Sequence, residues 1–224
     1  MDAVFLGMNE AGQKVYNWLN QRDDVDVLAL LTEKEQLSLI KQLEPSIVIS
    51  SGFEHKVPKK IIEIPEKGII NLHPSFLPYN RGAHPYIWPI IDNTPAGVSI
   101  HYMNEEIDQG KIIDRKEVPV FPEDTAKTLH EKLMREQFEH FKNNWDKLKE
   151  DAEAEQQNEK EATKHTKEDL DNLRNIELDE EVRVGEFLDR LRALSYPPRT
   201  NAYIEKNGVK YFVELNIASE STFQ

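Results

Sequence analysis

The sequence contains no cysteine and no long hydrophobic run. Without cysteine the chain can form neither a disulfide nor a thiolate metal site, and it has no cysteine nucleophile. No apolar stretch approaches the length of a membrane-spanning helix, and residues Met1 to Gly7 lack the basic region of a secretory signal. A cysteine-free chain of this kind fits a reducing compartment, and we therefore expect a cytoplasmic protein.

Basic charge is also scarce. The 224 residues include 28 Lys and Arg against 41 Asp and Glu, a net charge of −13. The segment from Asp146 to Glu181 contains 14 of the acidic and 6 of the basic residues. A chain without a basic stripe lacks the charge on which binding to a phosphate backbone or an anionic membrane depends. The composition therefore argues against nucleic acid and membranes as partners, and it leaves room for one small anion site.

Short apolar runs alternate with helix-like segments through the first half of the chain. The opening run ends at Gly7, and helical spacing from Ala11 to Leu19 follows it. This alternation, repeated further along, is typical of an α/β fold with a parallel sheet. The later runs Ala96 to Tyr102 and Lys111 to Val118 have only a turn between them, so we expect them to extend the sheet in antiparallel fashion. The sequence predicts a Rossmann-like domain with a mixed, mainly parallel sheet.

The second half begins with a long amphipathic pattern. Apolar residues recur every three or four positions as far as Leu148, which predicts one helix capped by Asp124 or Thr125. We interpret residues 151–181 as an acidic, helical and solvated linker. Residues 182–224 combine a short helix with an Asn207-Gly208 hairpin signal, and alternation predicts that one face of the hairpin is buried. The expected domains are thus residues 1–150, a linker over residues 151–181, and a small subdomain over residues 182–224.

Two common kinds of cofactor site have no support in the sequence. The turn from Gly7 to Gly12 has the outer glycines of a dinucleotide fingerprint, but Met-Asn-Glu stands where the middle glycine should approach a pyrophosphate. A tight structural turn explains it better. The histidines lack metal-ligand spacing, so we propose no metal site.

The residues most able to carry chemistry follow the apolar run at Gly68. Asn71 and His73 share one face at the carboxyl end of a predicted parallel strand, where open α/β sheets place their sites. An asparagine amide can donate to a developing oxyanion, and a histidine can act as a base near neutral pH. Asp108 could orient that imidazole if it reached the same point. Together the three suit acyl transfer, whereas a lone strand-end histidine is more often structural.

The pattern Asn71-Leu-His73-Pro-Ser75-x-Leu77-Pro78-x-x-x-Gly82, followed by Asp108-Gln109-Gly110, resembles the folate-dependent formyltransferases. These include glycinamide ribonucleotide transformylase, methionyl-tRNA formyltransferase and the sugar N-formyltransferases. The segment Val184 to Pro198 is similar to the reduced C-terminal part of the sugar enzymes. The resemblance implies a catalytic domain over residues 1–150 and formyl transfer from 10-formyltetrahydrofolate to a nucleotide-linked amino-deoxysugar. We favour dTDP as the nucleotide and surface polysaccharide of the O-antigen type as the purpose.

The resemblance also implies roles for individual residues. His73 would accept the amine proton, Asn71 would donate to the oxyanion, and Asp108 would hold His73. The expected folate-side residues are Ser51, Gly52, Phe53, Phe76, Leu77 and Pro78. The expected sugar-nucleotide residues are Tyr79, Asn80, Arg81 and His84, with Arg81 as the natural phosphate partner. Structural explanations stay open for several residues, since Phe76 and Leu77 suit a core, Arg81 suits a salt bridge, and His101 suits a packed or surface position.

Other functions remain open. Within the family these are a methionyl-tRNA or glycinamide ribonucleotide formyltransferase and a formyltetrahydrofolate hydrolase, and outside it a non-catalytic α/β binding protein. The C-terminal piece is too short and acidic for a tRNA-gripping domain, and this favours the sugar enzyme. A homodimer through the hairpin or the strands near Ile112 and Val118 is compatible with the sequence.

Overall fold

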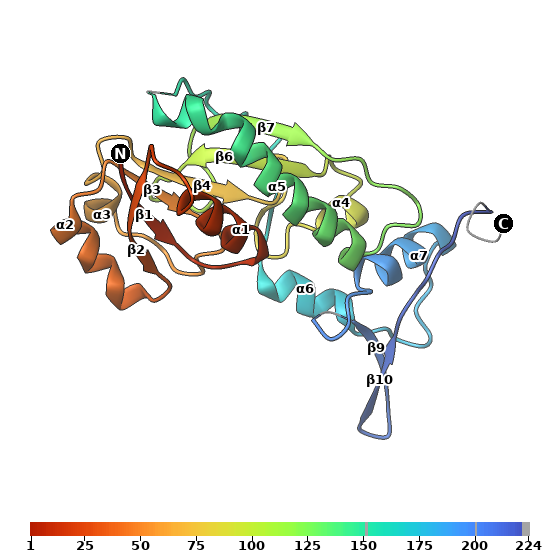
Figure 1. The fold of residues 1–224 in the computed structure, drawn as a ribbon. Coiled ribbons are helices and arrows are strands. Elements are labelled where there is room, and N and C mark those ends of the chain that lie inside the picture. The colour runs from red at the N-terminus through yellow and green to blue at the C-terminus, as the bar shows by residue number, and fades with distance from the viewer. Residues whose placement is uncertain (151, 200, 221–224) are drawn as a thin grey trace.

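The computed structural model describes residues 1–150, 152–199 and 201–220. The helices (α), one 3-10 helix (η) and the strands (β) follow one another along the chain as in Figure 1. In order they are β1 (Asp2–Leu6), α1 (Glu10–Leu19), β2 (Asp26–Leu31), η1 (Lys34–Ser38), α2 (Leu39–Leu43), β3 (Ile47–Ser50), α3 (Lys59–Ile62), β4 (Ile69–His73), β5 (Arg81–Gly82), α4 (Trp88–Ile91), β6 (Gly97–Tyr102), β7 (Ile112–Glu117), α5 (Ala126–Lys149), β8 (Lys164–His165), α6 (Lys167–Arg174), α7 (Val184–Ala193), β9 (Ala202–Lys206) and β10 (Val209–Val213).

A six-stranded sheet forms the centre of the molecule, with the strand order β2-β1-β3-β4-β6-β7. The first four strands of this order are parallel. Strand β6 runs antiparallel to both of its neighbours, β4 and β7. The predicted mixed sheet with its antiparallel extension is therefore confirmed.

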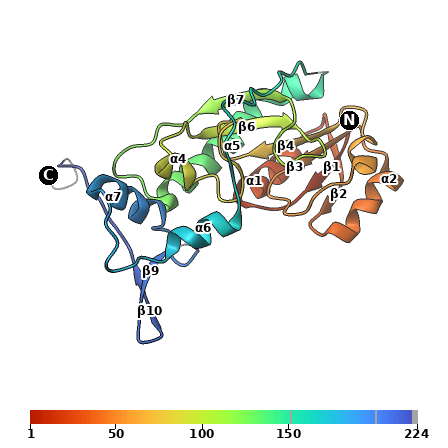
Figure 2. The ribbon, with the colours of Figure 1, turned by 180° about the vertical axis from the view of Figure 1, so that it is seen from behind.

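Helices cover both faces of the sheet, because alternate residues of each strand point to opposite faces. One face packs against α1 and the C-terminal half of α5, with Phe5 and Leu72 of the sheet in one cluster with Phe141 and Trp145. The other face packs against η1, α2 and α3. Figures 1 and 2 show α1 and α5 together on one side of the sheet.

Helix α5 begins where the sequence predicts. Thr125 is the N-cap, and its Oγ1 accepts a hydrogen bond from the backbone N–H of Thr128 at 3.4 Å. The side chain of Thr128 in turn accepts the backbone N–H of Thr125 at 3.0 Å, which completes a capping box. One of the two expected caps is thus confirmed.

The segment after α5 differs from the solvated linker that its composition predicts. Its backbone pairs with Ile112 through Glu155, and its short strand β8 lies parallel to β5. The side chain of Gln157 is buried. The acidic residues face solvent, while the backbone and the few buried polar groups satisfy donors and acceptors of two loops, which composition alone does not reveal.

The C-terminal part contains α6, α7 and the hairpin β9–β10. Asn207 and Gly208 both have positive φ, 54° and 76°, as a type I′ turn requires, so the predicted hairpin turn is confirmed. The expected burial of one hairpin face holds only at the base of the hairpin. Ala202 is buried there, and Ile204, Val213 and Leu215 pack against the same core cluster. Val209 and Tyr211 are exposed, and the turn end of the hairpin stands away from the body in Figures 1 and 2.

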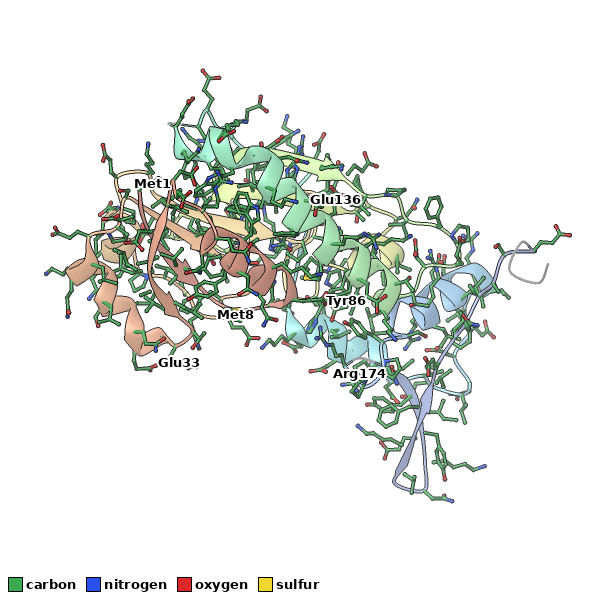
Figure 3. The ribbon with its side chains drawn as sticks, viewed as in Figure 1. Met1, Met8, Glu33, Tyr86, Glu136 and Arg174 are labelled. Atoms are coloured by element: carbon green, nitrogen blue, oxygen red, sulfur yellow. The ribbon has the colours of Figure 1, made fainter. Side chains whose placement is uncertain are left out.

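Aromatic side chains join this part to the sheet domain. Tyr86 lies with its ring centroid 5.0 Å from that of His130 in α5 and 5.7 Å from that of Tyr196. At the junction with the hairpin, Arg174 donates to the backbone carbonyl of Asn201 at 3.2 Å. Figure 3 labels Tyr86 and Arg174. Within the described part of the chain, no helix combines the length and apolar character needed to cross a membrane.

Candidate active site

The end of strand β4 lies on a cleft of about 720 Å³. Ile70 and Leu72 belong to the cluster under α1 and α5, so the side chains between and after them, Asn71 and His73, point to the opposite face. Both line the cleft, as their two-residue spacing requires. The cleft thus opens at the carboxyl ends of parallel strands, where open α/β sheets bind ligands.

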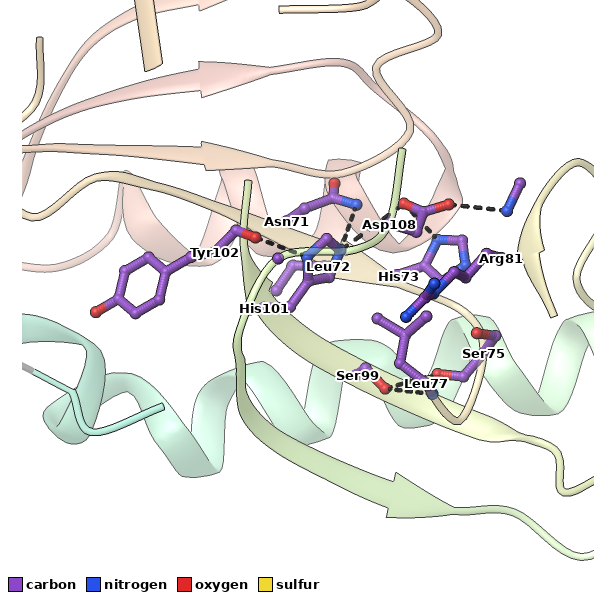
Figure 4. Close-up of polar contacts among 12 residues, drawn as sticks. Asn71, Leu72, His73, Ser75, Leu77, Arg81, Ser99, His101, Tyr102 and Asp108 are labelled. Carbon is purple, nitrogen blue, oxygen red and sulfur yellow. Dashed lines mark hydrogen bonds and ion pairs between the residues drawn. The ribbon is translucent and has the colours of Figure 1, made fainter. Parts of the chain in front are cut away.

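Asp108 lies beside these two residues, in the loop between β6 and β7. Its Oδ1 is 3.6 Å from Nδ1 of His73 and 3.8 Å from Nε2 of His101. Its Oδ2 accepts the backbone N–H of Gly82 at 2.9 Å. Figure 4 shows the carboxylate between the two imidazoles. The segment from His73 to Gly82, which follows β4, and the loop after β6 therefore meet at the carboxylate of Asp108.

The two ring nitrogens of His73 have different surroundings: Nδ1 faces Asp108, and Nε2 faces no polar partner among the described residues. A proton on Nδ1 faces Asp108, and this tautomer leaves a lone pair on Nε2. Nε2 is buried, and no group in the described part of the chain forms a hydrogen bond with it. The separation of 3.6 Å from Asp108 is longer than a hydrogen bond, as is common for catalytic pairs without bound substrate.

His101 was expected to be either a packed or a surface histidine. It is packed, and it also lines the cleft. It is 1% exposed and stands opposite Asn71 in the register of β4 and β6. Burial lowers the pKa of His101 to about 4, so the ring is neutral. Nδ1 is 2.9 Å from the carbonyl oxygen of Tyr102 and must donate to it. Nε2 is then an acceptor, and Nδ2 of Asn71 donates to it at 3.2 Å.

This bond determines how the Asn71 amide is oriented. One amide hydrogen is held by His101, and no acceptor in the described part of the chain holds the second, which can therefore reach a ligand in the cleft. No sequence motif indicated this function of His101. The available signal was the strand register, because His101 pairs with Asn71 only when β6 runs antiparallel to β4.

The structure separates the expected folate-side residues into two groups. Gly52 and Phe53 line the cleft. Ser51 is buried behind them, and its hydroxyl donates to Oδ1 of Asn9 at 2.8 Å. Leu77 is fully buried and donates its backbone N–H to Oγ of Ser99 at 3.1 Å. The residues lining the cleft do not include Phe76, Leu77 or Pro78.

The expected sugar-nucleotide residues separate in the same way, because His84 lines the cleft and Tyr79, Asn80 and Arg81 do not. Asn80 is fully buried, and its Nδ2 donates to Oγ1 of Thr94 at 2.9 Å. Arg81 is 3% exposed and forms an ion pair with Glu159, Nη2 to Oε1, at 2.8 Å. Arg81, the expected phosphate partner, thus forms its ion pair within the protein, which agrees with the alternative prediction of a salt bridge.

Further residues that no sequence motif indicated also line the cleft. The loop before β7 contributes Met103 and Ile107, and the segment from Lys164 to Lys167 contributes a wall that includes two lysines. With Lys56, these lysines bring three positive charges to a cleft that is also lined by four carboxylates, those of Glu54, Glu105, Glu106 and Asp108. Burial and the charge of Lys167 lower the pKa of His84 on the same wall. A segment composed mainly of acidic residues therefore supplies basic groups to the site.

The glycine turn after β1 has a structural explanation. Asn9 caps α1 through Oδ1, which accepts the backbone N–H of Gly12 at 2.7 Å. A Cβ on Gly7 would lie 2.4 Å from the backbone nitrogen of Phe53, so only glycine fits there. Among the described residues, no group of three or more His, Asp or Glu side chains is arranged to hold a metal ion.

Comparison with known proteins gives concordant findings. Residues 7–143 match the family model described as Formyl transferase, and residues 169–219 match the N-formyltransferase dimerization C-terminal domain. A dTDP-4-amino-4,6-dideoxyglucose formyltransferase from Mycobacterium bovis is 30% identical over 177 residues, which cover 78% of this chain and 74% of the relative.

Two solved structures are also similar. A 4-N formyltransferase from Francisella tularensis superimposes with a TM-score of 0.85 at 28% identity, covering 97% of this chain and 98% of its own. A formyltransferase from Anoxybacillus kamchatkensis, in complex with UDP-4,6-dideoxy-4-formamido-L-AltNAc and tetrahydrofolate, gives a TM-score of 0.68 at 25% identity. That match covers 77% of this chain and 89% of the other.

Proposed function

The chain belongs to the formyl transferase family and is a formyl-transferring enzyme, and we propose that it acts as a sugar N-formyltransferase. It takes the formyl group from 10-formyltetrahydrofolate and transfers it to the amine of a nucleotide-linked amino-deoxysugar. The observation that carries this proposal is the arrangement of Asn71, His73 and Asp108 on one cleft, with a free lone pair on Nε2 of His73. A binding protein without catalysis has no need of this combination.

The chain's own residues would perform three tasks. The Asn71 amide donates its free hydrogen to the formyl oxygen, where negative charge develops as the amine adds to the formyl carbon. Nε2 of His73 accepts the proton that the attacking amine releases. The proton then passes to N10 of the folate as the bond from N10 to the formyl carbon breaks, so charge and atoms balance. Asp108 orients His73 and stabilises its protonated form.

The cleft suits both substrates. Phe53, Val57, Met103 and Ile107 offer apolar walls for a pterin, and the volume of about 720 Å³ is in the range of ligand sites. Lys56, Lys164 and Lys167 are suitable partners for the diphosphate of a nucleotide sugar. They take the place of Arg81, which is engaged elsewhere.

The relatives support a 4-amino sugar, because the relative from Mycobacterium bovis is a dTDP-4-amino-4,6-dideoxyglucose formyltransferase and the Francisella enzyme is a 4-N formyltransferase. We propose a dTDP-linked 4-amino-4,6-dideoxysugar as the acceptor and assembly of surface polysaccharide as the purpose. We also propose that residues 1–150 act as the catalytic domain, with Lys164 to Lys167 of the following segment completing the wall of its cleft. We propose in addition that two chains pair through residues 182–224 and the neighbouring α6. The match to a dimerization domain and the exposed hairpin residues Tyr211 and Phe212 support this pairing.

Tetrahydrofolate release from 10-formyltetrahydrofolate tests the function directly. We expect release that depends on a dTDP-4-amino-4,6-dideoxysugar and that falls by orders of magnitude in Asn71→Ala, His73→Asn and Asp108→Ala, with the melting temperature nearly unchanged. Release without any amine would identify a hydrolase. A His73→Asn variant with full activity would remove His73 as the base.

A further inference from the structure

Gln157 is a buried amide in a segment that is otherwise mostly exposed. It lies between α5 and β8, 8% exposed, while its neighbours Gln156 and Asn158 face solvent. No sequence motif singles it out, and it does not line the cleft. Its side chain nevertheless forms four hydrogen bonds with the two loops that carry the site.

Each end of the amide serves one of these loops. Oε1 accepts from Nε and Nη2 of Arg81, at 3.1 and 2.7 Å, and so holds the loop that follows His73. Nε2 donates to the backbone carbonyls of Asp108 and Gly110, at 2.8 and 2.7 Å, and so holds the loop that follows β6. One side chain thus links the loop after the proposed base to the carboxylate that orients that base.

The chemistry of the link requires an amide. Only a group with an acceptor at one atom and two donor hydrogens at another can satisfy a guanidinium and two carbonyls together. A carboxylate would keep the guanidinium and repel the carbonyls, and an apolar side chain would leave all of them unsatisfied in a buried place.

The backbone of Asp108 needs such support. Its φ is 56°, in the left-handed region that residues with a Cβ seldom adopt. A strained conformation of this kind persists only where its surroundings hold it. The carboxylate is held by the Gly82 N–H, and the carbonyl by Gln157.

We propose that Gln157 is a positioning residue for catalysis, which fixes Asp108 against His73 by tying the two loops together. The inference rests on the proposed function only in taking Asp108 as part of the catalytic group. A displacement of about 1 Å in a catalytic group can reduce the rate by about a hundredfold, so a loosened loop has a measurable effect.

Gln157→Glu tests the proposal and retains the acceptor for Arg81, so the variant should fold. We expect kcat to fall at least tenfold, with the KM of each substrate changed by less than threefold and the melting temperature within a few degrees. Gln156→Glu is the matched control, since it makes the same change at the adjacent exposed position, and its kcat should stay within twofold. If Gln157→Glu does not fold, Gln157→Ala takes its place with the same expectation, because the shorter side chain leaves room for water to reach the guanidinium and the two carbonyls.

Coupling to Asp108 distinguishes positioning from general support. In an Asp108→Asn background, Gln157→Glu should reduce kcat less than twofold, because the residue through which it acts is already lost. An equal loss in both backgrounds, or no loss in the wild-type background, would overturn the proposal.

Hydrogen exchange provides a readout that needs no substrate. Exchange of backbone amides over residues 103–111 should be faster in Gln157→Glu and unchanged in Gln156→Glu. If the wild-type protein formylated no sugar, this measurement would still report on the link between the loops. Unchanged exchange in Gln157→Glu would overturn the link itself.

Discussion

At the scale of single residues, the orientation of the Asn71 amide depends on the protonation of a neighbour. A neutral His101 donates at Nδ1 and accepts at Nε2, so it holds one hydrogen of the Asn71 amide. A protonated His101 would have a donor at both nitrogens and would turn the amide around. The low pKa of His101, about 4, keeps the productive arrangement at every pH at which the enzyme is expected to work.

His101→Phe should therefore lower kcat about five- to tenfold, the equivalent of one lost hydrogen bond of about 1 kcal/mol or slightly more. The phenyl ring keeps the shape and removes both nitrogens. Because His101 is neutral throughout, the ratio of wild-type to variant kcat should be constant from pH 6 to pH 9. A ratio that changes across this range would mean that His101 exchanges a proton during turnover.

Sequence alone was sufficient for some site residues and not for others, for physical reasons. Asn71 and His73 follow from strand periodicity, which depends only on local geometry. Arg81 has the chemistry of a phosphate partner, but its contacts come from Glu159, 78 positions away in the sequence. The hydrogen-bond partners of Gln157 lie 47 to 76 positions away in the sequence, and no local pattern carries information about them.

At the scale of elements, the packing of α5 against the C-terminal part includes a buried histidine. His130 is hydrogen bonded to Tyr196, with Nδ1 and the phenol oxygen 3.1 Å apart. Burial, with the charge of Arg199, lowers the pKa of His130 to about 4. In the unfolded chain this histidine has a pKa near 6.5, so between pH 6.5 and 4 the unfolded state binds the proton and the folded state does not.

The stability that neutral His130 contributes is therefore complete above pH 6.5 and is lost as the pH falls toward 4. His130→Gln should lower the free energy of unfolding more at pH 7.5 than at pH 5. Urea denaturation at the two pH values measures this difference, and the other histidines cancel because both proteins contain them. An equal loss at both values would show that His130 does not titrate between them.

The N-cap of α5 permits a second test at this scale. Thr125→Ala removes the side-chain oxygen that accepts the N–H of Thr128, and we expect a loss of about 1 kcal/mol in the free energy of unfolding. Lys127→Ala, in the first turn of the same helix, is the control and should change stability by less than about 0.5 kcal/mol.

The cap and the long helix α5 could be predicted from the sequence because both depend on neighbouring residues. The path of the chain after α5 was not, because it depends on loops formed much earlier in the sequence.

At the scale of the whole molecule, most of the large exposed apolar side chains lie outside the part of the chain that forms the cleft, although Ile107 is exposed and lines the cleft. The residues that line the cleft end at Lys167. Large exposed apolar side chains gather in the part that follows, namely Leu178, Val182, Val184, Leu188, Val209, Tyr211 and Phe212. The sequence predicted that the hairpin alternation would bury a face, and within one chain this face is covered at Val213 and Leu215 but exposed at Val209 and Tyr211. The same alternation is explained if a second chain covers that face, as the proposed dimer requires.

Tyr211→Glu should therefore convert a dimer into a monomer. Tyr211 belongs to the alternating apolar face of β10 and is 52% exposed, and a carboxylate at this position would lose its hydration in an apolar interface. Sedimentation equilibrium at several protein concentrations measures the change in mass. Lys210→Glu places the same residue at the adjacent position, on the opposite face of the same strand, and should leave the dimer intact. Since the cleft lies in the preceding part of the chain, kcat of the Tyr211→Glu monomer should stay within about twofold of the wild-type value. A wild-type protein that is monomeric at all concentrations would remove the dimer, and a large loss of kcat in the monomer would mean that the partner chain supports the catalytic cleft.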